Sequence, residues 1–181
     1  MGCHPGFPLS TRRFGSAKVS QLSSRVARGA TLFLCVCTLF MAAFAATTAE
    51  AKMRRDKLTL ETTMGDVVID IEVAETPAEK SLGLMYRTNV PEKSGMLFPY
   101  PQPNEITMWM RNTYISLDMV FIRADGVVHR IEANTEPMSE KVIGSVGPVT
   151  AVLELAAGAA ERLSLKPGAR VRHAHFRNAK P

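Results

Sequence analysis

Hydrophobic and polar residues alternate in short runs from Leu58 onward, which is the pattern of β-strands with one buried face. The clearest run is residues 67–73, in which every second residue is apolar while Asp70 and Glu72 point the other way. Further runs predict strands over residues 58–62, 95–98, 106–111, 117–123, 127–131, 151–155 and 169–176. About eight short strands favour an α+β, mainly β domain, in which a small antiparallel sheet closes or nearly closes into a barrel.

One clear helix start lies at Thr76, before a segment predicted to be helical near residues 77–85. Thr76 can accept a hydrogen bond from the amide of Glu79, whose side chain can return one. Pro77 suits the first helical position, because an amide there would have no partner within the helix. We expect the helix to turn its apolar residues toward the core, namely Ala78, Leu82 and Met85. A second, shorter helical segment is expected near residues 159–163.

Two stretches are expected to lack regular structure. Residues 99–104 contain three prolines, and proline donates no backbone hydrogen bond and restricts the residue before it. Residues 132–148 show no regular period and are predicted to form a long surface loop. By contrast, Asp125 and Gly126 predict a tight hairpin turn between two strands.

The formal net charge of +5 lies almost wholly in the first 51 residues, which hold five Lys and Arg but one acid. Behind these charges runs an uncharged apolar segment, residues 30–46, and two possible A-x-A cleavage sites lie at residues 43–45 and 49–51. This order is typical of a secretory signal peptide, so we expect residues 1–51 to be cleaved on export to the periplasm or outside. The alternative is an uncleaved leader that anchors the chain to the inner membrane, although the apolar run is short for a spanning helix.

The mature chain then consists of a basic linker, residues 52–57, and a single β-rich domain, residues 58–177. It carries 17 Lys and Arg and 16 Asp and Glu, so it is nearly neutral. We therefore expect no nucleic-acid partner, because such binding depends on a net positive charge that attracts phosphates. The cysteines Cys3, Cys35 and Cys37 all fall in the leader. The domain therefore has no means of forming a disulfide or a thiolate metal site, and no cysteine nucleophile.

Residues 107–118 hold the densest group of chemically useful side chains, including the only Trp. Apolar residues flank Asp118 on both sides, and a buried carboxylate needs a partner, for which Arg87 or Arg111 is available. Asp118 is either a general acid, base or ligand anchor, or a structural acceptor that ties the turn at 112–113 to its neighbours. Trp109 either fills the hydrophobic core or forms a platform on which a ligand stacks, and we expect it in the core.

Two further groups of side chains are candidates for chemistry. Glu154 lies within an apolar strand and would complete a glycosidase-like carboxyl pair if it shared a cleft with Asp118. His173 and His175, two apart on a predicted strand, have acceptable metal-ligand spacing, but neighbouring arginines oppose a cation. We therefore expect a solvated edge strand and no metal there. The chain contains none of the common nucleophile, zinc-protease, phosphate-loop or dinucleotide motifs.

Five short blocks of the chain are shared with a known family. They are GLMYR at 83–87, GMLF at 95–98, MWMRNT at 108–113, LDMVFI at 117–122 and VLEL at 152–155. In this order the blocks resemble the bacterial and archaeal family called domain of unknown function 192, over about residues 67–171. Met108 and Tyr100 stand where the family usually has Phe, and the first of these swaps is volume-tolerant. The resemblance implies a compact β-rich domain, often exported, with no established reaction or cofactor.

The family's motif positions coincide with the residues selected above as a candidate site: Arg87, Trp109, Asn112, Thr113, Asp118 and Glu154. We expect an exported, monomeric domain that binds a small molecule or an envelope partner without a cofactor or catalysis of its own. One alternative is an envelope hydrolase that uses Asp118 and Glu154 as acid and base. The other is that the polar cluster is purely structural.

Overall fold

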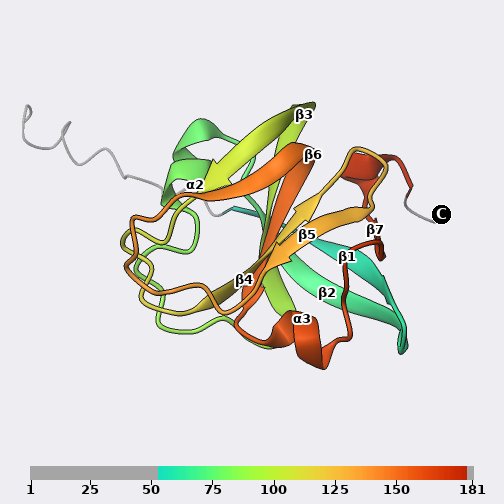
Figure 1. Ribbon diagram of the computed structural model, residues 1–181, viewed down its shortest axis with the longest axis horizontal. Coiled ribbons are helices and arrows are strands. Elements are labelled where there is room, and N and C mark those ends of the chain that lie inside the picture. Colours follow the sequence, from blue (N-terminus) through green and yellow to red (C-terminus); the bar gives the residue numbers. More distant parts are fainter. Residues whose placement is uncertain (1–52, 179–181) are drawn as a thin grey trace, which may run out of the picture. The chain divides into compact units, whose positions relative to one another are not determined.

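A curled sheet of seven strands makes up most of the computed structural model, which describes residues 53–178 (Figure 1). The strands are β1 (Arg54–Thr62), β2 (Gly65–Val73), β3 (Ser94–Met108), β4 (Leu117–Ile122), β5 (Val128–Glu132), β6 (Ile143–Ala156) and β7 (Arg170–Arg172). The helical segments are α2 (Pro77–Leu82), α3 (Ala159–Arg162) and the 3-10 turn η1 (Ala174–Phe176). The predicted mainly β, barrel-like domain is confirmed.

The strand order is β5-β4-β6-β3-β2-β1-β7, and the pairs are antiparallel except for a short parallel contact between β2 and β3. The two outermost strands of this order meet again at a bridge between Val127 and Arg170. The Val128 amide donates to the Ala169 carbonyl at 2.8 Å beside that bridge. The hairpin turn before β5 was predicted correctly; Gly126 there has φ 78°, and a Cβ would meet the Val171 carbonyl at 2.6 Å.

β3 continues without a break through residues 99–104, the proline-rich stretch that was expected to be irregular. That prediction is wrong. The register with β6 shifts between Pro99 and Asn104, so residues 100–103 oppose Thr150 alone. Two of the three prolines lie in this wide bulge, where no ladder N–H is required of them. Both strands change direction there (Figure 1), and the two runs predicted as separate strands form one.

Three other boundaries differ from the predicted ones. β1 begins at Arg54, so most of the expected basic linker belongs to the first strand. β6 begins at Ile143, inside the expected surface loop, because a second register shift between Glu105 and Thr107 interrupts the alternation there. The last predicted strand ends at Arg172 and continues as η1.

The capping box of α2 is present, with Glu79 N–H donating to Thr76 Oγ1 at 3.2 Å and Thr76 N–H donating to Glu79 Oε2 at 2.8 Å. The expected inward face is wrong, because the helix ends at Leu82 and buries none of its residues. Leu82 is 45% exposed, and Leu84, just beyond the helix, enters the core instead.

The sheet carries a separate apolar cluster on each face. Alternation along β4 assigns Val120 and Ile122 to the first cluster and Met119 and Phe121 to the second. All six residues of β4 are buried, which explains its continuous apolar run. The close approach of β3 to β6 requires Gly95, where a Cβ would lie 2.5 Å from the Glu154 carbonyl.

Candidate functional site

A groove of about 810 Å³ lies between the outer face of the β1–β2 hairpin and the segment that follows α2. Its floor comes from outward-facing residues of the two strands, Arg55 and Lys57 on β1 and Asp70 and Glu72 on β2. They point outward because the alternate positions of both strands fill the core. The opposite wall is formed by residues of the segment after α2: Leu84, Arg87, Asn89, Val90 and Pro91.

Opposite charges face each other across the floor of the groove. In the antiparallel register Arg55 stands opposite Glu72 and Lys57 opposite Asp70, whose charged atoms are 3.6 Å apart. Arg87 reaches down from the wall and donates two hydrogen bonds to the Glu72 carboxylate, at 3.2 and 2.5 Å. This forked pair is partly buried, which fixes the Arg87 side chain against the hairpin.

Arg55 differs from the other cations of the groove. Among the described residues, its guanidinium makes no hydrogen bond or ion pair. A guanidinium presents five N–H donors in a planar fork that matches carboxylate and phosphate oxygens. The groove therefore combines an available anion-binding group with a wall that is partly apolar.

The structure brings four of the predicted site residues to neighbouring positions. The Asn112 carbonyl accepts the Tyr86 N–H at 2.9 Å, which joins residues 109–113 to the segment that carries Arg87. Asn112 holds a left-handed conformation with φ 56°, and Thr113 beside it is buried. Trp109 is 48% exposed, so the core interpretation is wrong; the Arg111 guanidinium stacks on its ring at 4.5 Å.

Asp118 is fully buried, and neither expected arginine is its partner. Its carboxylate accepts three backbone N–H groups, from Asn134 at 2.9 Å, Gly158 at 3.1 Å and Ala160 at 2.9 Å. The last two stand at the start of α3, which has no side-chain cap of its own. Asp118 on β4 therefore caps α3 and also holds the loop that contains Asn134 beside this helix. The turn that it ties down is not the one at 112–113.

Glu154 is buried on the other face of the sheet. Opposite it stand Met96 on β3 and Met119 on β4, both fully buried. The carboxyl group makes no hydrogen bond to any described residue, and burial raises its pKa from 4.5 to about 8. Nearby, Tyr100 has a raised pKa because of its own burial and the Glu154 charge.

The two carboxyl groups do not share a cleft. Asp118 pairs with Leu155 and Glu154 with Met119, so they occupy successive positions across one ladder. Successive residues of a strand point to opposite faces, and the sheet separates the two groups. The geometry required of an acid–base pair is absent here.

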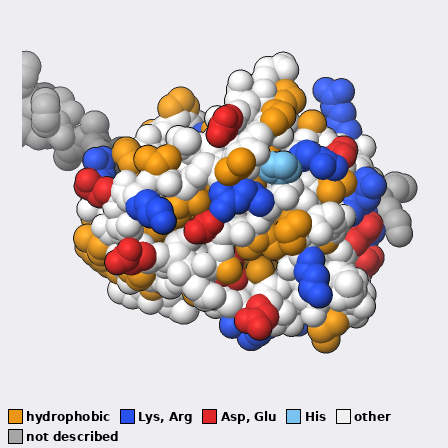
Figure 2. All heavy atoms as spheres, in the orientation of Figure 1, with side chains coloured by type: hydrophobic (Ala, Val, Ile, Leu, Met, Phe, Trp, Pro, Cys, Tyr) orange, Lys and Arg blue, Asp and Glu red, His pale blue; other side chains and the backbone are white. Residues whose placement is uncertain are grey.

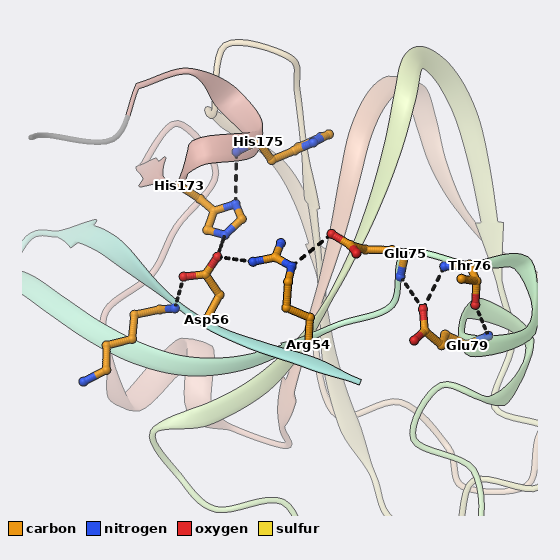
Figure 3. A network of polar contacts seen from close by, with 8 residues as sticks. Arg54, Asp56, Glu75, Thr76, Glu79, His173 and His175 are labelled. Carbon is orange, nitrogen blue, oxygen red and sulfur yellow. Dashed lines mark hydrogen bonds and ion pairs between the residues drawn. The ribbon is translucent and has the colours of Figure 1, made fainter. Parts of the chain in front are cut away.

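His173 and His175 do not project from one strand. His173 is buried, its Nδ1 accepts the His175 backbone N–H at 3.2 Å, and its Nε2 lies 3.2 Å from Asp56 Oδ2. Because Nδ1 is the acceptor, the hydrogen is on Nε2, whose N–H donates a hydrogen bond to Asp56; Figure 3 shows the contact. Asp56 also binds Arg54, which contacts Glu75 ahead of α2. Nε2 of His173 thus joins the C-terminal segment to β1, while Nδ1 caps η1 within that segment.

Within residues 53–178 there is no group of three or more His, Cys, Asp or Glu side chains arranged to hold a metal ion. The helices of this part are too short or too polar to cross a membrane. Among the residues that line the groove, only Arg87 is one of the predicted site residues. The signal for the others was the opposite charge of the two outward faces. The sequence prediction instead placed Arg55 and Lys57 in a basic linker, and Asp70 and Glu72 on the polar face of a strand.

Comparison with known proteins supplies the family. No curated protein matches the chain. A solved structure from Sinorhizobium meliloti, described as a candidate transcription regulator, is 39% identical and has a TM-score of 0.67; the match covers 69% of this chain and 98% of that one. Another, from Novosphingobium aromaticivorans and of unknown function, is 39% identical with a TM-score of 0.66, covering 71% of this chain and 91% of that one. Residues 59–173 match the profile described as "DUF192: Uncharacterized ACR", and the chain belongs to this family.

Proposed function

We propose that the chain is an exported, non-catalytic binding domain of the cell envelope, and that the groove between the β1–β2 hairpin and residues 84–91 holds its ligand. The observation that carries the proposal is Arg55, a cation with no described partner beside the forked Arg87–Glu72 pair. A carboxylate or phosphate of a small molecule would meet Arg55 in the groove. Asp70 and Asn89 would accept hydrogen bonds from donors on the same ligand.

The absence of a shared cleft favours binding over the hydrolase alternative. Asp118 is occupied by three backbone N–H groups, and Glu154 lies on the opposite face of the sheet. The description of the S. meliloti structure as a transcription regulator suggests DNA binding. The net charge of this chain gives that function little support. From Lys52 onward the chain carries 17 basic and 16 acidic residues, which offers little net attraction for phosphate backbones.

The test of the groove uses the ¹⁵N-labelled domain and three probes: inorganic phosphate, the N-acetylalanine anion and neutral N-acetylalaninamide. We expect the two anions to shift backbone resonances of the groove and the neutral amide to shift them far less. Arg55→Ala should weaken binding about tenfold or more, because a charge-assisted hydrogen bond contributes about 1.5–3 kcal/mol. Arg55 is exposed and has no polar partner among residues 53–178, so the variant should fold normally.

Arg123→Ala is the matched control, since Arg123 is an exposed arginine paired with Asp125 in the hairpin before β5. It should leave anion binding unchanged. Equal weakening by both substitutions, or shifts that avoid the groove, would contradict the assignment. Export is tested separately by mass spectrometry of the protein recovered from the envelope fraction, with an N-terminus near Lys52 expected after cleavage.

A further inference from the structure

The charges that line the groove are paired, with one exception. Arg87 holds Glu72 in the forked pair, and the Lys57 ammonium lies 3.6 Å from the Asp70 carboxylate. Figure 2 shows basic and acidic side chains interspersed in a similar way over one face of the domain. Arg55 forms no such pair within the part of the chain that the structure describes. The groove therefore offers one uncompensated positive charge to a ligand.

The single charge of Arg55 restricts the kind of anion that can bind. Asp56, the next residue of β1, points to the opposite face of the sheet, where Arg54 and His173 donate to its carboxylate (Figure 3). A ligand carboxylate has one negative charge and two oxygens, which one guanidinium fork satisfies. A phosphate group carries about −1.5 to −2 charges at neutral pH. Its second charge would face Glu72, which stands opposite Arg55 in the register.

The wall of the groove carries hydrogen-bonding side chains that are also available. The Asn89 amide and the Ser94 hydroxyl make no hydrogen bond to any described residue. A side-chain amide both donates and accepts hydrogen bonds, as a peptide group does, so Asn89 can bond a ligand amide in either direction. Apolar surface on the same wall comes from Leu84, Val90 and Pro91. The wall thus offers both amide hydrogen bonding and an apolar contact.

The groove is larger than a simple anion requires. Its volume of about 810 Å³ lies in the range of clefts that hold drug-sized ligands, about 300–1,000 Å³. An inorganic anion would fill only a small part of it. A short peptide supplies everything that the groove can bind: one terminal carboxylate, amide groups along the backbone and an apolar side chain.

We propose, as an extension that rests on the proposed function, that the ligand of the groove is a short peptide with a free C-terminal carboxylate. Arg55 binds the carboxylate, Asn89 bonds a peptide amide, and an apolar last side chain lies against the apolar part of the wall. Capture of a chain end by its carboxylate is a recurring mode of peptide recognition. Because the acids of the groove are already paired, the amino terminus of the peptide adds little to binding.

The experiment is a calorimetric titration of the chain as it is recovered from cells. The probes are N-acetyl-Ala-Ala-Leu, its C-terminal amide, N-acetyl-Ala-Ala-Ser and inorganic phosphate. We expect the leucine-ended acid to bind most tightly. Its amide should bind about tenfold or more weakly, because it lacks the charge-assisted hydrogen bonds to Arg55. The serine-ended acid should bind roughly threefold or more weakly, since it buries less apolar surface.

Two substitutions test the residues that the proposal assigns to the peptide. Asn89→Ala should weaken binding of the leucine-ended acid several-fold; Asn89 is exposed and has no described partner, so the variant should fold normally. Asn104→Ala, at an exposed position of β3 outside the groove lining, is the matched control and should leave binding unchanged. Arg55→Lys keeps the charge but loses the planar fork, so the preference for the acid over the amide should shrink.

The possible failures distinguish this inference from the function on which it rests. Phosphate that binds as tightly as the leucine-ended acid, and still depends on Arg55, would overturn the peptide ligand while the anion-binding groove stands. Equal effects of the two asparagine substitutions would also overturn it. Failure of every probe to bind, phosphate included, would contradict both the peptide ligand and the proposed function.

Discussion

Asp118 and Glu154 are carboxyl residues on adjacent strands, yet the protein solvates them in opposite ways. Three backbone N–H groups surround Asp118, and they replace the water that burial removes. Glu154 faces methionine side chains and has no hydrogen bond from the described residues. The carboxylate of Asp118 has its hydrogen-bonding capacity satisfied, whereas burial disfavours the ionised form of Glu154. The pKa of Glu154, raised to about 8, follows from this difference.

The raised pKa of Glu154 makes stability depend on pH. Because the folded state holds this proton more tightly than the unfolded state, its contribution is fully present below about pH 4.5 and is lost as pH rises to about 8. Glu154→Gln removes the titration while keeping the size and polarity of the protonated form. The free energy of unfolding of the variant, relative to the original protein, should rise by up to about 1.4 kcal/mol per pH unit between these limits.

Denaturant unfolding of both proteins from pH 4.5 to 9 measures this difference. Glu140→Gln, at an exposed loop position, is the control and should show no such slope. A flat difference for Glu154→Gln would mean that the carboxyl group is solvated in a way the structure does not contain.

At the scale of single elements, α3 illustrates how a short helix is stabilised from outside. It spans only Ala159–Arg162, and isolated helices of that length do not form in water. Its N-terminal amides are satisfied by Asp118 on β4, and Ala159 and Ala160 are buried in the first apolar cluster. The helix therefore exists because the sheet supplies both its cap and its packing.

Asp118→Ala should destabilise the domain by about 3–5 kcal/mol, because it leaves three backbone N–H groups without an acceptor in a buried site. Hydrogen exchange should show the largest loss of protection at Gly158, Ala160 and Asn134, the three donors. Loss of protection spread evenly over the sheet would argue against a capping role. Asp125→Ala, at an exposed acid of similar size, serves as the control.

The elements that the sequence predicted well are those in which local pattern and tertiary environment agree. Residues 67–73 alternate strictly because β2 has one buried and one solvated face, and Thr76 and Glu79 form their capping box within four residues. Residues 99–104 were predicted wrongly because a bulge depends on the partner strand, here Thr150. No local rule indicates which residues will oppose a proline.

The candidate site was predicted in part, for a related reason. The burial of Asp118 followed from its apolar neighbours. The hydrogen-bond partners of Asp118, and the face of the sheet that Glu154 occupies, depend on the register of β4 with β6. Trp109 was predicted to lie in the core because large aromatic residues are usually buried, but its side chain is about half exposed. Arg55 was not predicted as a binding residue. That its guanidinium is available to bind an anion follows only from the ion pairs that its neighbours form in the folded structure.

At the scale of the whole molecule, β7 joins the two ends of the sheet. It pairs with β1 through Thr59–Arg172, Leu60–Val171 and Glu61–Arg170, while Val127 bridges to Arg170 on the other side. Arg172 forms ion pairs with Glu61 and Asp66, and Val171 is fully buried. Three residues thus link strands that are far apart in the sheet order.

Removing residues 168–181 should abolish cooperative thermal unfolding, since β1 and β5 would both lose their shared neighbour and the first apolar cluster would open. Removing only residues 179–181, which lie beyond the described part, is the matched control and should leave the transition unchanged. Calorimetry distinguishes the two. A sharp transition in the longer truncation would show that β7 is dispensable.

The position of β7 also sets the order in which the domain can be assembled. Thr59 on β1 pairs with Arg172 on β7, so more than 100 further residues must be synthesised before β1 can pair with its second neighbouring strand. Contacts this distant in sequence form slowly, because the intervening chain must be closed into a loop first. A nascent chain therefore remains without its completed sheet until residues 170–172 are available. Until then, only the contacts that need no residue of β7 can form, so the closing step of the fold comes late in translation.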